Sequence, residues 1–193
     1  MNKYRTHNCG ELTSKNKNTD VSLSGWVNKK RDHGNLLFID LRDNYGVTQC
    51  VVEKNNKNFS ELEKLQLESV IKVVGKVVER SKETINPEIK TGEIEIYLKT
   101  YSLLGECKEL PMPVFSDQEY SEEIRLKYRF LDLRRKKIHQ NIILRSKVIS
   151  FIRNKMISLG FLEYQTPILT SSSPEGARDF LVPSRLNPGK FYA

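Results

Sequence analysis

The feature that most constrains this chain is an alternation of apolar and polar residues that runs, with one interruption, from Val21 to about Leu104. A period of two places successive side chains on opposite faces of a strand, so the pattern predicts an all-β module. The stretch VSLSGWVNK (21–29) puts three aliphatic side chains and a glycine on one face. The stretches LLFIDLR (36–42) and GVTQCVV (46–52) follow the same rule on either side of a polar turn. Together they predict a meander of three strands.

One helical segment interrupts the alternation. In NFSELEKLQLES (58–69), Ser60 and Glu63 have the spacing of a capping box ahead of Leu62, Leu65 and Leu67, so we expect a short helix there. Two further alternating stretches, SVIKVVGKVVER (69–80) and GEIEIYLKTYSLL (92–104), predict the fourth and fifth strands. Three strands, a helix and two strands is the order of an OB-fold, a small barrel that commonly binds single-stranded nucleic acid.

The second predicted strand carries a polar outward face. If alternate aliphatic residues fill the core, Phe38, Asp40 and Arg42 point outward, and the hairpin pairs Asp40 with Gln49. An exposed aromatic ring beside an amide and charges is suited to stacking on an unpaired base and reading its edge. The alternative, that Phe38 packs under a loop or against another domain, stays open. Trp26, which is also on the outward parity, is interpreted as structural.

Composition narrows the classes of protein. The formal net charge of +8 favours a polyanionic partner, although scattered surface lysines would give the same total. No apolar run approaches the length that spans a bilayer, and the N-terminal stretch lacks the apolar centre of a secretory signal. We therefore expect a cytoplasmic protein with no membrane contact. Cys9, Cys50 and Cys107 are far apart in the chain, so neither a disulfide framework nor a metal site is expected.

A second region begins where the alternation stops. CKELPMPVF (107–115) contains two prolines, which interrupt strand ladders and helices and mark a linker. The charged run SDQEYSEEIRLKYRFLDLRRKK (116–137) fits either a solvated helix face or a contact with a phosphate backbone. From Ile142 to Leu159 the apolar residues have helical spacing, which predicts a long amphipathic helix that ends at Gly160.

The stretch FLEYQTPIL (161–169) predicts a short strand, in which Pro167 requires an edge, a bulge or an interface because proline donates no ladder hydrogen bond. The apolar helix face has little left in the chain to pack against. We therefore expect the second domain to be truncated or completed by another polypeptide. The predicted domains are 1–105 for the barrel, 106–140 for the hinge and 141–193 for the incomplete domain.

Several stretches carry a resemblance to one family. RTHNCGEL (5–12), SGWVNKKRDHGNLLFIDLRD (24–43) and RLKYRFLDLRR (125–135) resemble the anticodon-binding domain and hinge of bacterial-type aspartyl-tRNA synthetases, a class II family. The long helix, FLEYQTPIL and PEGARDFLVPSR (174–185) resemble the family's first signature motif and substrate loop. The resemblance covers nearly the whole chain. It implies an OB-fold β-barrel of five strands and one helix, followed by a hinge and the truncated start of an α+β class II catalytic domain.

The resemblance also implies an anticodon site on the barrel. Phe38 matches the aromatic residue on which the central anticodon base stacks, and Arg31 and Gln49 match residues that hold this base. Arg80 and Glu95 match residues near the neighbouring bases. The implied partner is tRNA(Asp).

In the C-terminal part the resemblance implies a dimer contact and an amino-acid-binding loop. Pro167 matches the motif-one proline at the dimer interface, which implies a homodimer. Glu175 matches a carboxylate that binds the ammonium group of the substrate aspartate. Ser173, Gly176 and Ala177 belong to the same substrate loop, although backbone freedom alone would also account for Gly176.

His33 leads to a hypothesis about specificity. A histidine at this place in RDHG resembles family members that charge both tRNA(Asp) and tRNA(Asn), whereas discriminating members tend to carry leucine. The alternative is that His33 is an ordinary exposed loop residue.

The activity implied is the ligation of L-aspartate to tRNA through an aspartyl-adenylate, with ATP and Mg²⁺ as substrate and cofactor of the complete enzyme. The 193 residues end before the second and third class II motifs, so we expect them to be inactive alone and to contain no catalytic residue and no metal ligand. Two other hypotheses stay open. One is a free-standing OB-fold module that binds tRNA or single-stranded RNA without catalysis, and the other is a structural or dimerisation fragment.

Overall fold

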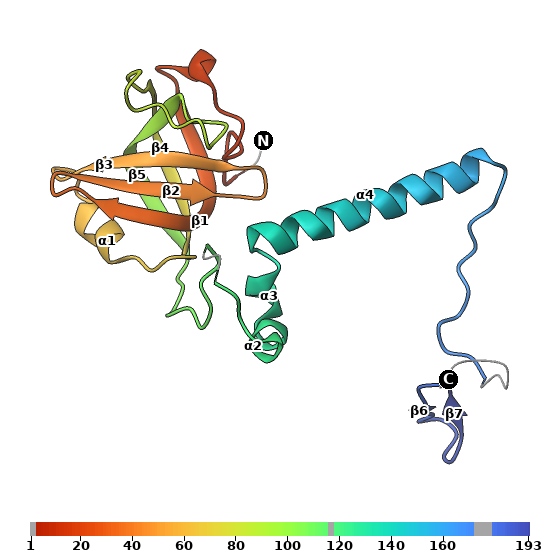
Figure 1. Cartoon of the computed structure of the whole chain (residues 1–193). Helices are drawn as coiled ribbons and strands as arrows, with labels where there is room; N and C mark the ends of the chain where they lie inside the picture. The colour runs from red at the N-terminus through yellow and green to blue at the C-terminus, as the bar shows by residue number, and fades with distance from the viewer. Residues whose placement is uncertain (1–2, 116–117, 172–178) are drawn as a thin grey trace. The chain divides into compact units, whose positions relative to one another are not determined.

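The computed structural model describes residues 3–115, 118–171 and 179–193 (Figure 1). The chain divides into two compact units, Met1–Arg135 and Lys136–Ala193. The first unit contains the barrel and the segment that follows it, and the second begins with a long helix. The predicted domain boundaries at 105 and 140 stay predictions.

Five strands form a closed barrel in the first unit. They are β1 (Asp20–Asp32), β2 (Leu36–Arg42), β3 (Val47–Glu53), β4 (Val70–Glu79) and β5 (Ile94–Gly105). Their order around the barrel is β1-β2-β3-β5-β4, and β4 pairs back onto β1 (Figure 1). The β3 and β5 strands are parallel, and the other neighbours are antiparallel. The predicted meander and the OB-fold are confirmed.

The barrel core follows the alternation of the sequence. Leu37, Ile39 and Leu41 of β2 are buried, as predicted, and the hairpin pairs Asp40 with Gln49. Because every second side chain enters the core, the residues between them lie on the outer face of the sheet. This outer face carries the candidate site.

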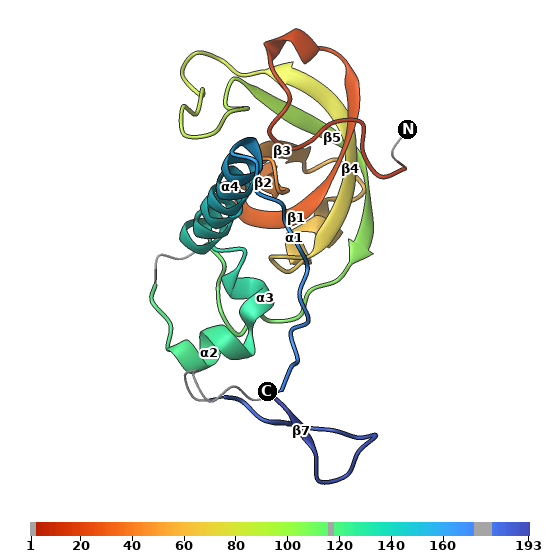
Figure 2. The same ribbon diagram turned by 90° about the vertical axis from the view of Figure 1, so that its right-hand side faces the viewer.

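The helix α1 (Phe59–Lys64) begins earlier than the capping-box pattern predicts. The predicted short helix is confirmed, but Asn58 is its N-cap residue and makes no side-chain capping bond, so the capping box at Ser60 is wrong. Phe59 and Leu62 are buried in the barrel core. Packing against one end of the barrel therefore determines where this short helix begins, because its apolar side chains must face the core (Figure 2).

The proline-containing segment after β5 forms neither helix nor strand, but it is packed rather than open. Met112 and Val114 are buried together with Leu131 in a small second core. Leu131 belongs to α3 (Arg129–Asp132), which follows α2 (Glu122–Lys127). We call residues 106–135 the hinge module.

The arginines of the charged run are held by a buried carboxylate. Asp132 is fully buried and pairs with Arg125 at 3.1 Å, Arg129 at 2.5 Å and Arg135 at 3.8 Å. These ion pairs account for three of the arginines of the run. The helix α2 buries none of its residues, which agrees with a solvated helix face, and the contact with a phosphate backbone stays a prediction.

The second unit contains α4 (Lys136–Ser158), β6 (Val182–Pro183) and β7 (Phe191–Tyr192). The helix ends as predicted ahead of Gly160, whose φ of +87° favours glycine. The strand predicted over 161–169 is absent, so that prediction is wrong, and Pro167 is exposed in an irregular segment. A strand requires a partner for its backbone groups, and 161–169 has none among the residues described here. In the described ranges, no helix is both long and apolar enough to span a membrane.

Candidate nucleic-acid interface

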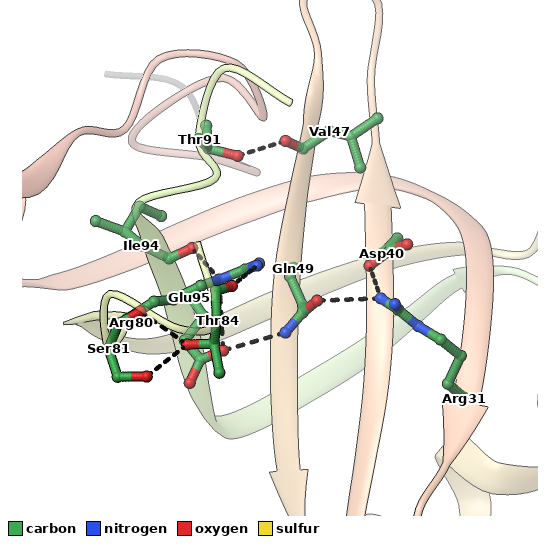
Figure 3. Close-up of polar contacts among 10 residues, drawn as sticks. All are labelled: Arg31, Asp40, Val47, Gln49, Arg80, Ser81, Thr84, Thr91, Ile94 and Glu95. Atoms are coloured by element: carbon green, nitrogen blue, oxygen red, sulfur yellow. Dashed lines mark hydrogen bonds and ion pairs between the residues drawn. The ribbon is translucent and has the colours of Figure 1, made fainter. Parts of the chain in front are cut away.

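Five polar side chains form a continuous row across the outer face of the barrel (Figure 3). Arg31 comes from β1, Asp40 from β2, Gln49 from β3 and Glu95 from β5, while Arg80 directly follows β4. The row thus follows the order of the strands around the barrel, with one residue from each. We call these five residues the polar row.

Hydrogen bonds and ion pairs connect the polar row from end to end. Arg31 Nη2 donates to Asp40 Oδ1 at 2.9 Å and to Gln49 Oε1 at 3.0 Å. Gln49 Nε2 donates to Glu95 Oε2 at 3.1 Å, and Arg80 Nε lies 3.6 Å from the same oxygen. Each carboxylate therefore has a guanidinium partner, and the formal charges of the row cancel.

A β-bulge places Arg31 in the polar row. Strict alternation from the buried Val27 would turn Arg31 toward the core. The register between β1 and β2 shifts between Val27 and Lys29, so Arg31 pairs with Phe38 and shares its outer face. The sequence analysis did not predict this bulge. The signal that marks it is the end of the aliphatic alternation at Asn28.

The amide of Gln49 is held in one orientation. Its side chain must present Nε2 to the Glu95 carboxylate, which accepts, and Oε1 to Arg31, which donates. Gln49 is only 7% exposed and Phe38 is half-buried. The prediction of a fully outward patch is therefore corrected, because neighbouring side chains cover part of both residues.

Partial burial shifts the pKa values at one end of the polar row. Burial raises the pKa of Glu95, and the charge of Arg80 and the hydrogen bond from Gln49 oppose that rise. Burial lowers the pKa of Arg80, and the charges of Glu95 and Asp40 oppose that change. The carboxylate and the guanidinium therefore depend on each other to stay charged in this partly dry site.

Two guanidinium donors in the polar row have no partner among the described residues. Arg80 Nη2 and Arg31 Nε are both buried and make no hydrogen bond there. The Arg80 side chain is only 4% exposed, and its other donors bind Ile94 O at 3.1 Å and Thr84 O at 3.2 Å. An unsatisfied buried donor is costly. Both atoms are covered by neighbouring groups, so a ligand that supplies acceptor oxygens or nitrogens reaches them only when those groups move.

The ring of Phe38 lies beside the polar row. The His33 ring, in the β1–β2 loop, meets it edge-on at 5.3 Å between centroids, with an angle of 87° between planes. The Arg31 guanidinium lies 6.0 Å from the Phe38 centroid. The structure therefore brings Arg31, His33, Phe38 and Gln49 together. The role of His33 in specificity stays a prediction.

The remaining predicted residues do not join this site. Pro167 lies in the other unit, and Ser173, Glu175, Gly176 and Ala177 lie outside the described residues. No group of three or more His, Cys, Asp or Glu side chains is arranged to hold a metal ion within the described ranges.

One aromatic residue has partners that the sequence analysis missed. The Trp26 ring centroid lies 5.6 Å from the guanidinium of Arg42 and 4.8 Å from that of Arg134. Arg42 lies on the outward face of β2 with Phe38, as predicted, and pairs there with Glu68 at 2.6 Å. The sequence alternation puts Trp26 and Arg42 at outward-facing positions of their strands, and this was the signal that the two side chains could meet.

Two family models match the chain. Residues 21–104 match the OB-fold nucleic acid binding domain, and residues 121–193 match the tRNA synthetases class II (D, K and N). An OB-fold barrel followed by the start of such a domain defines the N-terminal part of a class II tRNA synthetase. The chain belongs to the aspartyl-tRNA synthetase family within that class.

Curated relatives match over all 193 residues. The "Aspartate--tRNA(Asp/Asn) ligase" of Pelagibacter ubique (strain HTCC1062) is 78% identical, and the chain covers 32% of it. The protein of the same name from Phenylobacterium zucineum (strain HLK1) is 61% identical, with 33% of its length covered. The chain thus spans about a third of the length of the curated relatives it matches.

Solved structures agree with the fold. The asparaginyl-tRNA synthetase from Pyrococcus horikoshii, complexed with asparaginyl-adenylate, has a TM-score of 0.81 at 26% identity, over 96% of this chain and 41% of that one. A putative aspartyl-tRNA synthetase from Leishmania major Friedlin also has a TM-score of 0.81, over 100% of this chain and 39% of that one. Its identity of 21% limits this second likeness to the fold.

Proposed function

We propose that the protein is an aspartate–tRNA ligase whose barrel reads the anticodon of tRNA(Asp) and tRNA(Asn). The observation that carries the proposal is the polar row, with its fixed amide and two unpaired guanidinium donors beside the Phe38 ring. The names of the relatives supply the amino acid and the two tRNAs. A free-standing RNA-binding module is not favoured, because residues 121–193 match a class II synthetase model.

In this proposal the barrel binds unpaired bases by stacking and by edge reading. A base on the Phe38 ring gains about 1–3 kcal/mol from stacking. Gln49 retains one acceptor lone pair and one N–H after its bonds to Arg31 and Glu95. Because the amide is held in one orientation, it distinguishes a base edge with a matching donor and acceptor from one with the reverse order. Arg31 adds a donor on the same side.

The ligation chemistry is proposed for the complete enzyme. ATP activates the aspartate carboxylate, and Mg²⁺ neutralises phosphate charge. The described residues lack a metal-ligating cluster, so no step with ATP or Mg²⁺ is assigned to them. Glu175 is proposed to bind the ammonium group of aspartate, in the substrate loop with Ser173, Gly176 and Ala177. Pro167 is proposed to lie in a homodimer interface. The enzyme acts in the cytoplasm.

His33 is proposed to act on specificity through Phe38. Its ring lies 5.3 Å, between centroids, from the ring on which a base would stack, so it affects where that base lies. If changing His33 to leucine leaves the ratio of charging of tRNA(Asp) to tRNA(Asn) unaltered in the complete enzyme, this part of the proposal fails.

The test is equilibrium binding by fluorescence anisotropy at a stated salt concentration. The ligands are labelled anticodon stem-loops with the triplets GUC, GUU and a scrambled sequence. We expect GUC and GUU to bind with similar affinity and the scrambled loop to bind more weakly. Phe38→Ala should remove this discrimination, whereas the control Tyr4→Ala, on the N-terminal segment beside the other half of β1, should retain it. Equal and strongly salt-dependent binding of all three loops would mean that only the net charge of +8 acts.

A further inference from the structure

A second cluster of charged and aromatic groups joins the barrel to the hinge module. Glu68, which comes shortly before β4 in the chain, is at the centre of this cluster. Arg42 Nη2 donates to Glu68 Oε1 at 2.6 Å. Arg134 Nη1, from the hinge module, donates to its Oε2 at 2.9 Å. One carboxylate thus binds two guanidinium groups from opposite sides of the junction.

Aromatic rings complete the cluster. The Trp26 ring of β1 contacts the same two guanidinium groups, and the Phe115 ring of the hinge module lies 4.7 Å from that of Arg42. A cation–π contact of this kind is stronger when the guanidinium is partly removed from water. Burial accordingly lowers the pKa of Arg42, and the adjacent Glu68 opposes that change.

The backbone fixes Glu68 at this place. Its amide donates to Val27 O at 2.9 Å, and Val27 donates to Ser69 O at 2.9 Å, which continues the β1–β4 pairing. Glu68 has a φ of +65°, an uncommon conformation for a residue with a Cβ atom. Its side chain is only 1% exposed. The surrounding structure therefore holds a strained backbone that directs a carboxylate into the junction.

This cluster is distinct from the polar row but shares a strand with it. Arg42 is on the same outer face of β2 as Phe38 and Asp40. Arg134 directly precedes Arg135, the last residue of the first unit, after which α4 begins. The cluster therefore connects a strand that carries part of the candidate RNA-binding face to the last residues of the first unit.

We propose that Glu68 is the central residue of an ionic latch, formed with Trp26, Arg42, Phe115 and Arg134, that fixes the hinge module on the barrel. The latch fixes the hinge module relative to RNA held on the polar row within the first unit, and Glu68 is a positioning residue for that arrangement. This consequence rests on the proposed function, whereas the latch itself does not.

Trp26 is the only tryptophan of the sequence, so its fluorescence reports on the latch directly. In Glu68→Gln and Arg134→Gln, we expect quenching of Trp26 by acrylamide to rise about twofold, because local opening exposes the indole. Arg134→Lys, which keeps the charge, should restore part of the protection. The matched control is Glu79→Gln, which removes an exposed carboxylate paired with Lys17 on the same barrel.

A distance measurement tests the fixed orientation. Spin labels at Lys17→Cys on the barrel and Phe130→Cys in α3, with Cys107 replaced by serine, should give one narrow distance distribution. Arg134→Gln should broaden it. Wild-type quenching and an unbroadened distribution in Arg134→Gln would overturn the latch. If Glu68→Gln fails to fold, Arg134→Gln still decides, because its side chain lies outside the barrel and is 34% exposed.

RNA binding separates this proposal from the proposed function. Folded latch variants should bind the GUC stem-loop within about twofold of wild type, because the latch does not touch the polar row. Loss of stem-loop affinity in Arg134→Gln would overturn the separation of latch and site. If the wild-type chain itself does not bind RNA, the proposed function fails while the Trp26 result still stands.

Discussion

The polar row and the latch use the same kinds of residue on one face of the barrel, and they differ in what is left unpaired. Both combine guanidinium groups, carboxylates and an aromatic ring, and β2 contributes Asp40 to one and Arg42 to the other. In the polar row, Arg31 Nε and Arg80 Nη2 lack partners among the described residues. In the latch, both Glu68 oxygens are paired and the rings cover the guanidinium groups.

This difference separates a binding site from a structural contact. A site that is to receive a ligand retains hydrogen-bonding capacity that the ligand completes, whereas a contact within the fold satisfies its own groups. Residue type and outward parity do not distinguish the two. Substitutions in the latch and in the polar row test this distinction.

The largest effect is expected at Glu68. Glu68→Ala leaves two partly buried guanidinium groups without their carboxylate, which should lower the free energy of unfolding by about 3–5 kcal/mol. Urea denaturation followed by Trp26 fluorescence measures this loss. The control Glu79→Ala removes an exposed pair and should cost no more than about 1 kcal/mol. Equal losses in the two variants would remove the distinction between the latch and an ordinary surface pair.

Removing the central amide should weaken RNA binding. Gln49→Ala leaves Arg31 and Glu95 without their shared partner and removes the group that reads a base edge. We expect the affinity for the GUC stem-loop to fall by about 1–3 kcal/mol, with discrimination lost. Anisotropy titration checks this expectation. Unchanged affinity in a folded variant would show that the amide serves only the fold.

A matched pair of arginine substitutions compares the two clusters directly. Arg42→Lys loses the planar group that contacts two rings and should lower the free energy of unfolding by about 1–3 kcal/mol. Arg31→Lys should change stability by less than about 1 kcal/mol but weaken RNA binding. Urea denaturation and anisotropy on both variants give the comparison. The reverse pattern would exchange the roles assigned to the clusters.

The smallest expected effect is a pH dependence at Glu95. Its pKa is raised above the usual 4.5 by burial, so the folded state binds a proton more tightly than the unfolded state. Its contribution to stability is therefore present below the unfolded pKa and decreases as pH rises through the folded pKa. Glu95→Gln removes this dependence. The free energy of unfolding of the variant minus that of wild type, measured by urea denaturation, should therefore be more positive at pH 7 than at pH 4. Glu79→Gln, at an exposed site, is the control, and the same slope in both variants would contradict this assignment.

The sequence predicted the elements whose pattern is local. The period of two between residues 21 and 104 gave the five strands, and the apolar spacing from Ile142 to Leu159 gave α4, because each pattern depends only on neighbours along the chain. The outward parity of β2 also placed Phe38, Asp40 and Arg42 on one face. The same local reasoning failed at 161–169, since a strand also needs a partner.

Tertiary structure alone decided what each polar side chain does. The bulge at Asn28 turned Arg31 outward, and the burial of Gln49 fixed its amide between Arg31 and Glu95. The start of α1 at Phe59 followed from packing on the barrel. Local patterns along the chain were enough to predict the barrel and the types of residue on its outer face. Some of these polar side chains keep free donors for a ligand and others do not. The difference depends on partners far apart in the chain, because a hydrogen bond forms only between atoms that the fold brings within reach.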